Sequence, residues 1–207
     1  MSMSVNDMHR CAIGEADYWF RTPTAFDAPR IRRQLTRQGV RRPHETEIRI
    51  IALAGIDALA KAADDPAEGE RQKAVMEEWY TLVEPVREDD IDEPDFEKRA
   101  VLLAERERER LGRMGELLPE ATAIEANLSR HWPPYAELLA DRAYWDEISQ
   151  IEVVRLLLAR IGAADILRDA DGMMTDAAYV ALPAAHKPVL SAFASRLMMP
   201  DEATRKN

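Results

Sequence analysis

The chain has 207 residues and a formal net charge of −10, with 46% hydrophobic and 32% charged residues. This composition is globular: it is too apolar for a wholly disordered chain and too charged for a membrane protein. The single cysteine, Cys11, excludes an intrachain disulfide framework and favours a reducing compartment. The sequence has neither an apolar leader nor an apolar run near the ~20 residues of a membrane span, so we expect a cytoplasmic protein.

The N-terminal part of the chain is expected to begin irregularly. Residues 1–15 show no hydrophobic periodicity, which predicts a flexible lead-in that contains Cys11. Tyr18, Trp19 and Phe20 then form the densest aromatic cluster of the chain. Aromatic residues favour pleated surfaces and Pro23 disfavours helix just before it, so a short extended segment is predicted here.

An arginine-rich helix is predicted next. Thr24 or Asp27 can cap it, and Gly39 can end it. Its apolar residues are expected to point inward and its arginines outward. The inward set is Phe26, Ile31 and Leu35, and residues 30–42 hold six arginines, Arg30, Arg32, Arg33, Arg37, Arg41 and Arg42.

This basic segment belongs to an acidic protein. Residues 1–43 hold eight Lys/Arg and four Asp/Glu, a net charge of +4, so the remaining 164 residues sum to −14. Such an asymmetry concerns partners or self-association more than folding.

Two further helices are predicted from cap signals. Pro43 should open the first, because proline is favoured at the first helical position. Asp64, Asp65 and Pro66 should end it and cap the next, which stops near Pro85.

The middle of the chain alternates between strongly charged and helical segments. Residues 87–95 form an acidic connection, and a fourth helix follows from about residue 94. Its centre is almost entirely charged, which predicts a solvated or partner-facing helix. Gly112 and Gly115 should weaken its end, and Pro119 should open a separate shorter helix that ends near residues 131–134.

The strongest helical periodicity runs from about residue 134 to residue 161. Its apolar residues are spaced three or four apart and predict the core helix, with Tyr144, Ile148, Ile151, Val154, Leu158 and Ile161 on one face. Two short helices are expected near residues 175–182 and 183–198. The predicted fold is therefore all-α, an irregular multi-helix bundle with a short extended N-terminal segment. Its expected parts are a basic segment 1–43, a helical body 44–199 and a polar tail 200–207.

No constellation of catalytic residues stands out. The four histidines are scattered, no His-Glu-x-x-His or Gly-x-Ser-x-Gly motif is present, and glycines do not cluster before a helix. Residues 169–172, Asp-Ala-Asp-Gly, faintly resemble a calcium loop, but Leu167 and Ala178 occupy its outer ligand positions. We therefore expect no enzyme activity, no metal and no cofactor.

The basic segment admits three interpretations. It can neutralise phosphates of a nucleic acid, form a solvated face paired with acidic parts of the same chain, or dock on another protein. The acidic remainder of the chain and the lack of a second basic patch make nucleic acid the least favoured partner.

The run Tyr-Trp-Phe-Arg-Thr-Pro-Thr-Ala-Phe-Asp at residues 18–27, followed by the arginine-rich helix, resembles the tail assembly chaperones of long-tailed bacteriophages and prophages. Residues 77–94 and 126–149 add to this general likeness. The resemblance implies a mainly helical, non-enzymatic protein of the host cytoplasm. Such a protein binds the tape measure protein, keeps it soluble and can recruit the major tail protein. It implies no catalytic residues.

The first hypothesis is therefore a phage tail assembly chaperone that also self-associates. The alternatives are a structural virion component, such as a tail or head–neck connector, and a small regulatory or inhibitory protein that binds nucleic acid or a host complex through its arginine-rich helix. The candidate partner-binding residues are Tyr18, Trp19, Phe20, Arg30, Arg32, Arg33, Arg37, Arg41 and Arg42.

Overall fold

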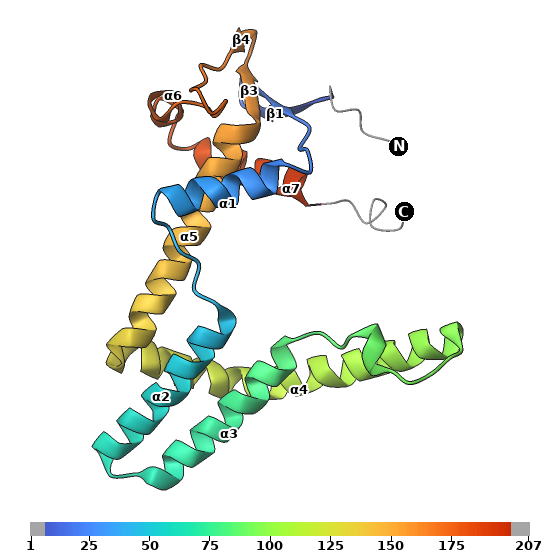
Figure 1. The fold of residues 1–207 in the computed structure, drawn as a ribbon, viewed down its shortest axis with the longest axis vertical. Helices are drawn as coiled ribbons and strands as arrows, with labels where there is room; N and C mark the ends of the chain where they lie inside the picture. The colour runs from blue at the N-terminus through green and yellow to red at the C-terminus, as the bar shows by residue number, and fades with distance from the viewer. Residues whose placement is uncertain (1–6, 200–207) are drawn as a thin grey trace. The chain divides into compact units, whose positions relative to one another are not determined.

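A computed structural model describes residues 7–199, which form seven α-helices and one four-stranded antiparallel sheet (Figure 1). The protein is thus mostly helical, and the all-α prediction is wrong in excluding a sheet. The chain divides into two compact units. Unit 1 is Met1–Arg42 with Asp141–Asn207, and unit 2 is Pro43–Ala140.

The observed units and the expected parts have similar first boundaries, but their later boundaries lie at different residues. The boundary predicted after residue 43 lies beside the junction of Arg42 and Pro43, but the predicted body of residues 44–199 falls into both units. Unit 1 therefore combines the two ends of the chain. The predicted tail, residues 200–207, lies outside the described residues.

The sheet of unit 1 joins strands from distant parts of the sequence. Its order is β1 (Met8–Ile13), β2 (Ala16–Arg21), β3 (Leu158–Ile161) and β4 (Ala164–Asp165). β1 and β2 form a hairpin whose turn contains Gly14 at φ +59°, a conformation that suits a residue without Cβ. The flexible lead-in predicted for residues 1–15 is wrong for residues 8–13, and residues 1–6 lie outside the described part.

The predicted core helix ends earlier than its periodicity indicates. α5 spans Pro133–Leu157, and Leu158 begins β3. Leu158 pairs with Phe20 of β2, and both side chains are fully buried. Pairing with β2 satisfies the backbone groups of residues 158–161, so the sheet replaces the last helical turn that was predicted.

Three further helices complete unit 1: α1 (Asp27–Arg37), α6 (Asp176–Val180) and α7 (Lys187–Met198). The core lies between them, the sheet and α5. Its fully or nearly fully buried side chains include Tyr18, Phe20, Leu35, Val154, Leu156, Leu157, Leu158, Met173, Met174, Leu190 and Ala194. Cys11, expected in a flexible segment, is buried in this core from β1. Phe26 is 82% exposed, so its predicted inward orientation is wrong.

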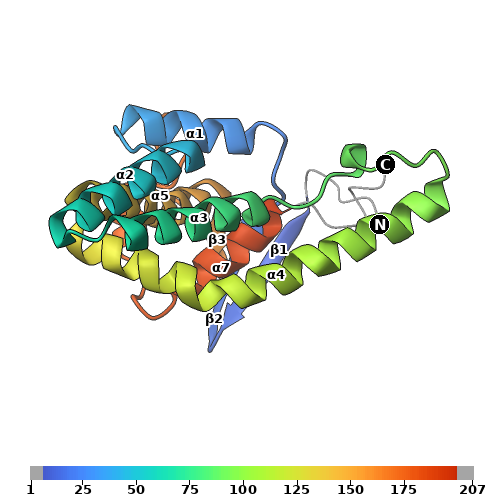
Figure 2. The same ribbon diagram turned by 90° about the horizontal axis from the view of Figure 1, so that it is seen from below.

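Unit 2 is a helical layer of α2 (Glu45–Ala63), α3 (Pro66–Val83) and α4 (Phe96–His131), with a short 3₁₀ turn, η1 (Glu88–Asp90), before α4. The three helices lie side by side (Figures 1 and 2). His44, not Pro43, precedes α2 and accepts a hydrogen bond from the Thr46 amide. Asp65 caps α3 by accepting from the Glu68 amide, as its position before Pro66 predicts.

α4 is one helix of 36 residues, so the separate helix predicted from Pro119 is wrong. A proline inside a helix removes one backbone hydrogen bond and costs about 3 kcal/mol. Here burial offsets that cost, because Leu117, Ala121, Ile124 and Leu128 on both sides of Pro119 are buried in α4. The proline is therefore tolerated within a continuous helix.

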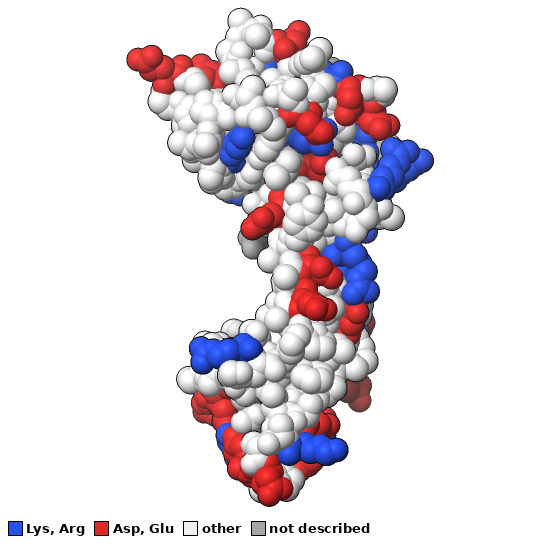
Figure 3. Space-filling model, turned by 90° about the vertical axis from the view of Figure 1, so that its left-hand side faces the viewer, with Lys and Arg blue, Asp and Glu red and all other residues white. Residues whose placement is uncertain are grey.

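The two units differ in charge. By sequence, unit 1 carries 16 Lys/Arg and 14 Asp/Glu, a net charge of +2, whereas unit 2 carries 12 and 24, a net charge of −12. Figure 3 shows acidic side chains gathered over the lower end of the displayed face, which is unit 2. Asp57, Asp64 and Glu70 line a hollow beside the α2–α3 turn, together with Lys61. No helix within residues 7–199 has the length and apolar character needed to cross a membrane.

Candidate protein-docking groove

A partly buried ion pair between Arg21 and Asp27 fixes the start of α1 in unit 1. Arg21, at the end of β2, donates two hydrogen bonds to the Asp27 carboxylate, at 2.7 and 2.8 Å. The Thr24 amide donates a third, at 2.6 Å. Burial alone would raise the pKa of Asp27, but the hydrogen bonds from Arg21 and Thr24 outweigh it and hold the pKa below its ordinary value. This pair sets the direction in which α1 leaves the sheet.

The other end of α1 is closed by a glycine cap. Gly39 has a φ of +72°, and its amide donates to the Thr36 carbonyl at 3.1 Å. The Val40 amide donates to the Leu35 carbonyl at 2.9 Å. These two bonds define a Schellman motif, in which the residue after the glycine folds back onto the helix. Val40 is buried beside Leu35 in consequence, and the chain turns towards α5.

A groove of about 810 Å³ lies along this side of α1, and we call it the α1 groove. Its apolar side chains come from α1, the turn after it, α5 and the end of α7. All of its lining residues belong to unit 1: Ala28, Ile31, Arg32, Leu35, Thr36, Gly39, Val40, Arg41, Arg42, Trp145, Ser149, Val153 and Met198.

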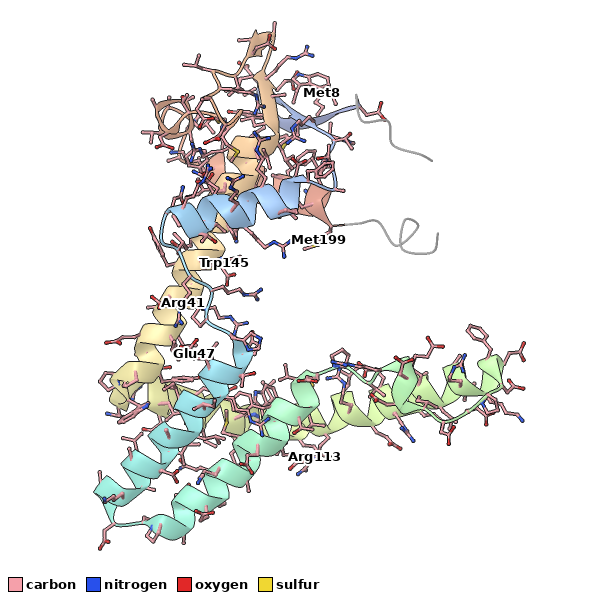
Figure 4. The ribbon with its side chains drawn as sticks, in the orientation of Figure 1. Met8, Arg41, Glu47, Arg113, Trp145 and Met199 are labelled. Carbon is pink, nitrogen blue, oxygen red and sulfur yellow. The ribbon has the colours of Figure 1, made fainter. Side chains whose placement is uncertain are left out.

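Arginines stand among the apolar lining of the α1 groove. The Arg42 guanidinium lies 4.9 Å from the centre of the Trp145 ring, within cation–π distance. Arg32 lines the groove from α1, and Arg41 lines it from the segment after that helix. Figure 4 labels Arg41 and Trp145, which come from this segment and from α5. The groove thus offers apolar surface and positive charge together.

The other arginines among the candidate partner-binding residues lie on the opposite side of α1. Residues of a helix follow one another at 100°, so Arg30, Arg33 and Arg37 share a face away from Ala28, Arg32 and the groove. Arg37 pairs with Asp171 at 3.4 Å, and both side chains are half-exposed or more. The six arginines of residues 30–42 therefore lie on two different surfaces.

The aromatic triplet is mainly part of the core. Tyr18 and Phe20 are 2% and 0% exposed. The Tyr18 hydroxyl lies 2.6 Å from Nδ1 of His186, and the Phe20 ring lies 5.1 Å from that of Phe193. Trp19 is half-buried and has the opposite orientation in β2. The burial of Tyr18 and Phe20 assigns them to the core and leaves them out of the groove.

Several groove residues were not among the sequence candidates. Trp145, Ser149 and Val153 are spaced four apart on α5, so they share one face of that helix. A sequence signal is present, since Trp145 and Val153 are apolar residues within the predicted core helix. Nothing in the sequence pairs this face with α1, more than 100 residues earlier.

The described residues contain no group of three or more His, Cys, Asp or Glu side chains able to hold a metal ion. Comparison of the chain with protein-family models, with curated proteins and with solved structures finds no match.

Proposed function

We propose that this chain is a non-catalytic binding protein whose α1 groove holds an acidic amphipathic helix of another protein. The observation that carries the proposal is the combination of apolar lining and arginine side chains in one groove. In helix-in-groove recognition, apolar anchors of the partner fill the groove, and charges at its edges set orientation and association rate. The arginine side chains in the lining favour a helix that carries acidic residues beside its apolar ones.

We further propose that the partner is the tape measure protein of a long-tailed phage, and that the chain acts as a tail assembly chaperone in the host cytoplasm. This step depends on the sequence resemblance, whose central run at residues 18–27 leads directly into α1. A tape measure protein is long and helical, so it needs its apolar surface covered before assembly. A groove lined by both apolar side chains and arginines suits reversible cover, because charge at an interface raises the association rate more than the affinity.

The test is co-expression of the chain with the product of a very long, helix-rich open reading frame immediately downstream of its gene. We expect co-expression to raise the soluble fraction of that product and to yield a complex on purification. Arg32→Glu should weaken the complex about tenfold, because it reverses a charge at the groove. Arg33→Glu is the matched control: it makes the same charge change one residue later on α1, outside the groove.

Four results would contradict the proposal. The first is the absence of a long helix-rich reading frame from the gene's surroundings. The second is an equal loss of binding in Arg32→Glu and Arg33→Glu, which would indicate general charge attraction. The third is the chain's presence in purified virions in ring stoichiometry, which would identify a connector. Self-association through the α1 groove would appear as an oligomer that Arg32→Glu dissociates, and it too would replace the proposed partner.

A further inference from the structure

A second hollow of unit 1, of about 460 Å³, lies on the side of α1 away from the α1 groove. We call it the arginine hollow. Three guanidinium groups and a single carboxylate line it, together with small and backbone groups. Its lining residues are Arg21, Thr24, Asp27, Arg30, Ala159, Arg168 and Gly172.

The charges of the arginine hollow do not cancel. Asp27 is bound by Arg21 through two hydrogen bonds, so these two side chains neutralise each other. Among residues 7–199, no carboxylate forms an ion pair with Arg30 or Arg168. Asp169, the acidic neighbour of Arg168, is engaged by the Met173 amide at 2.9 Å and lies 3.8 Å from Arg155. Arg30 and Arg168 therefore have no ion-pair partner in the hollow, and the charge of Asp169 only partly offsets the like charges around Arg168.

Arg168 is held in place by the backbone. Its guanidinium donates to the carbonyls of Gly172 at 2.6 Å and Leu158 at 2.7 Å. Burial lowers the pKa of Arg168, and the positive charges of Arg21 and Arg30 lower it further, while the negative charge of Asp169 opposes them in part. An arginine kept half-buried among like charges is electrostatically unfavourable, and a bound anion would remove that cost.

Arg30 approaches the same place from α1. A Cβ on Gly172 would lie 3.2 Å from Nη2 of Arg30, so the guanidinium reaches the loop that Arg168 holds. Gly172 has a φ of +71° and no side chain, which leaves that approach open. Arg30 and Arg168 thus come from distant parts of the sequence to line one hollow.

We propose that the arginine hollow binds a phosphoryl group, as inorganic phosphate or as the phosphate monoester of a small molecule. A phosphate monoester carries close to two negative charges at neutral pH, which matches the two arginines that have no ion-pair partner. Guanidinium groups bind phosphate oxygens through paired, charge-assisted hydrogen bonds. The inference is independent of the α1 groove and of the partner proposed for it, because the two surfaces lie on different sides of α1.

The test is an NMR titration of the ¹⁵N-labelled full chain with millimolar inorganic phosphate, at an ionic strength held constant with sodium chloride. We expect saturable shifts of the amide of Gly172 and of the side-chain N–H groups of Arg30 and Arg168. Arg30→Gln should weaken binding about tenfold or more, because it removes one of the two arginines that have no ion-pair partner. Arg30→Lys should retain part of the affinity, since it keeps the charge but not the paired donors.

The control variant is Arg160→Gln, which removes one charge from the neighbouring strand β3 at a residue outside the hollow. It should bind phosphate like the unchanged chain. Linear shifts without saturation, or equal affinity of Arg30→Gln and Arg160→Gln, would overturn the site. Titration with a glucose 6-phosphate solution separates the sources: tighter binding than inorganic phosphate indicates a monoester, and equal binding indicates the free ion. Arg30-dependent binding of a single-stranded oligonucleotide without any response to phosphate would replace the proposal with a nucleic-acid surface.

Discussion

Units 1 and 2 are built from contacts of different range along the chain. In unit 2, each helix packs on helices that are close in sequence, and an ion pair such as that of Arg113 and Glu78 lies at the surface. In unit 1, β2 pairs with a strand about 140 residues later, and a buried network around Glu152 and Arg155 joins α5 to α1. Long-range pairing costs more loop entropy than local helix packing, so unit 1 depends more on a few specific interactions.

Among the variants that test this contrast, Glu152→Ala should cause the largest loss of stability. Glu152 is 2% exposed, and its Oε1 accepts hydrogen bonds from Gln38 at 2.9 Å and from Arg155 at 2.8 Å. Removal leaves the buried Arg155 with only Asp176 and Asp169 as ionic partners. We expect a loss of about 3 kcal/mol in the free energy of unfolding, measured by chemical denaturation.

The matched variant in unit 2 is Glu78→Ala, which breaks the exposed pair with Arg113. Its effect should be far smaller, because water already solvates both groups. Hydrogen exchange measured by mass spectrometry should show that Glu152→Ala destabilises unit 1. Similar losses in the two variants would show that buried and surface ion pairs do not distinguish the units.

A smaller effect is expected at the junction of β2 and α1. Asp27→Asn removes the charge from the carboxylate that Arg21 and Thr24 bind, and should cost about 2 kcal/mol at neutral pH. The pKa of Asp27 is lower in the folded protein than in the unfolded chain, so its contribution is complete above the unfolded value, about 4. As the pH falls through the lower folded value, that contribution disappears.

The measurement is the difference in unfolding free energy between the unchanged chain and Asp27→Asn as a function of pH. The difference should shrink only below about pH 4. A difference that is constant through the acid range would mean that the Asp27 charge does not stabilise unit 1.

The smallest change in stability is expected from glycine substitutions in unit 2. A Cβ on Gly55 of α2 would lie 2.6 Å from Cδ1 of Trp132 and 2.8 Å from Cδ2 of Leu128, so Gly55→Ala forces the helices apart. Overpacking of this kind costs about 1–3 kcal/mol, against a gain of about 1 kcal/mol in helix propensity. We expect a net loss of about 1 kcal/mol in thermal or chemical unfolding.

Gly112→Ala is the counterpart on α4. Its Cβ would meet nothing within 4 Å, so only the propensity gain applies and the variant should be more stable, by up to about 1 kcal/mol. The opposite order of the two variants would show that α2 and α4 do not pack as closely as described.

The sequence predicted unit 2 better than unit 1, for a physical reason. Caps and breakers are local signals, and Asp64, Asp65 and Pro66 marked the α2–α3 turn correctly. Pro119 misled because burial on both sides of it, which local propensity does not report, keeps α4 continuous. The exposed charged part of α4 was expected from composition alone.

In unit 1 the missing information was the long-range partner of each strand. Residues 158–161 continue the apolar spacing of α5, and their pairing with β2, not their own pattern, makes them a strand. The same limit applies to the candidate site. The arginines of the basic segment were evident, but their separation onto two sides of α1 depends on α5 and on residues 168–172, which arrive from the other end of the chain.

The burial of Cys11 gives the molecule a natural chemical label. It is the only thiol in the chain, lies in β1 with 6% of its surface exposed, and has a pKa raised by burial, an effect that the nearby Arg196 opposes. A thiol in this environment reacts with maleimide or Ellman's reagent only when the strand that holds it opens. The rate of this reaction in native buffer therefore reports the opening of unit 1 alone, because unit 2 has no cysteine.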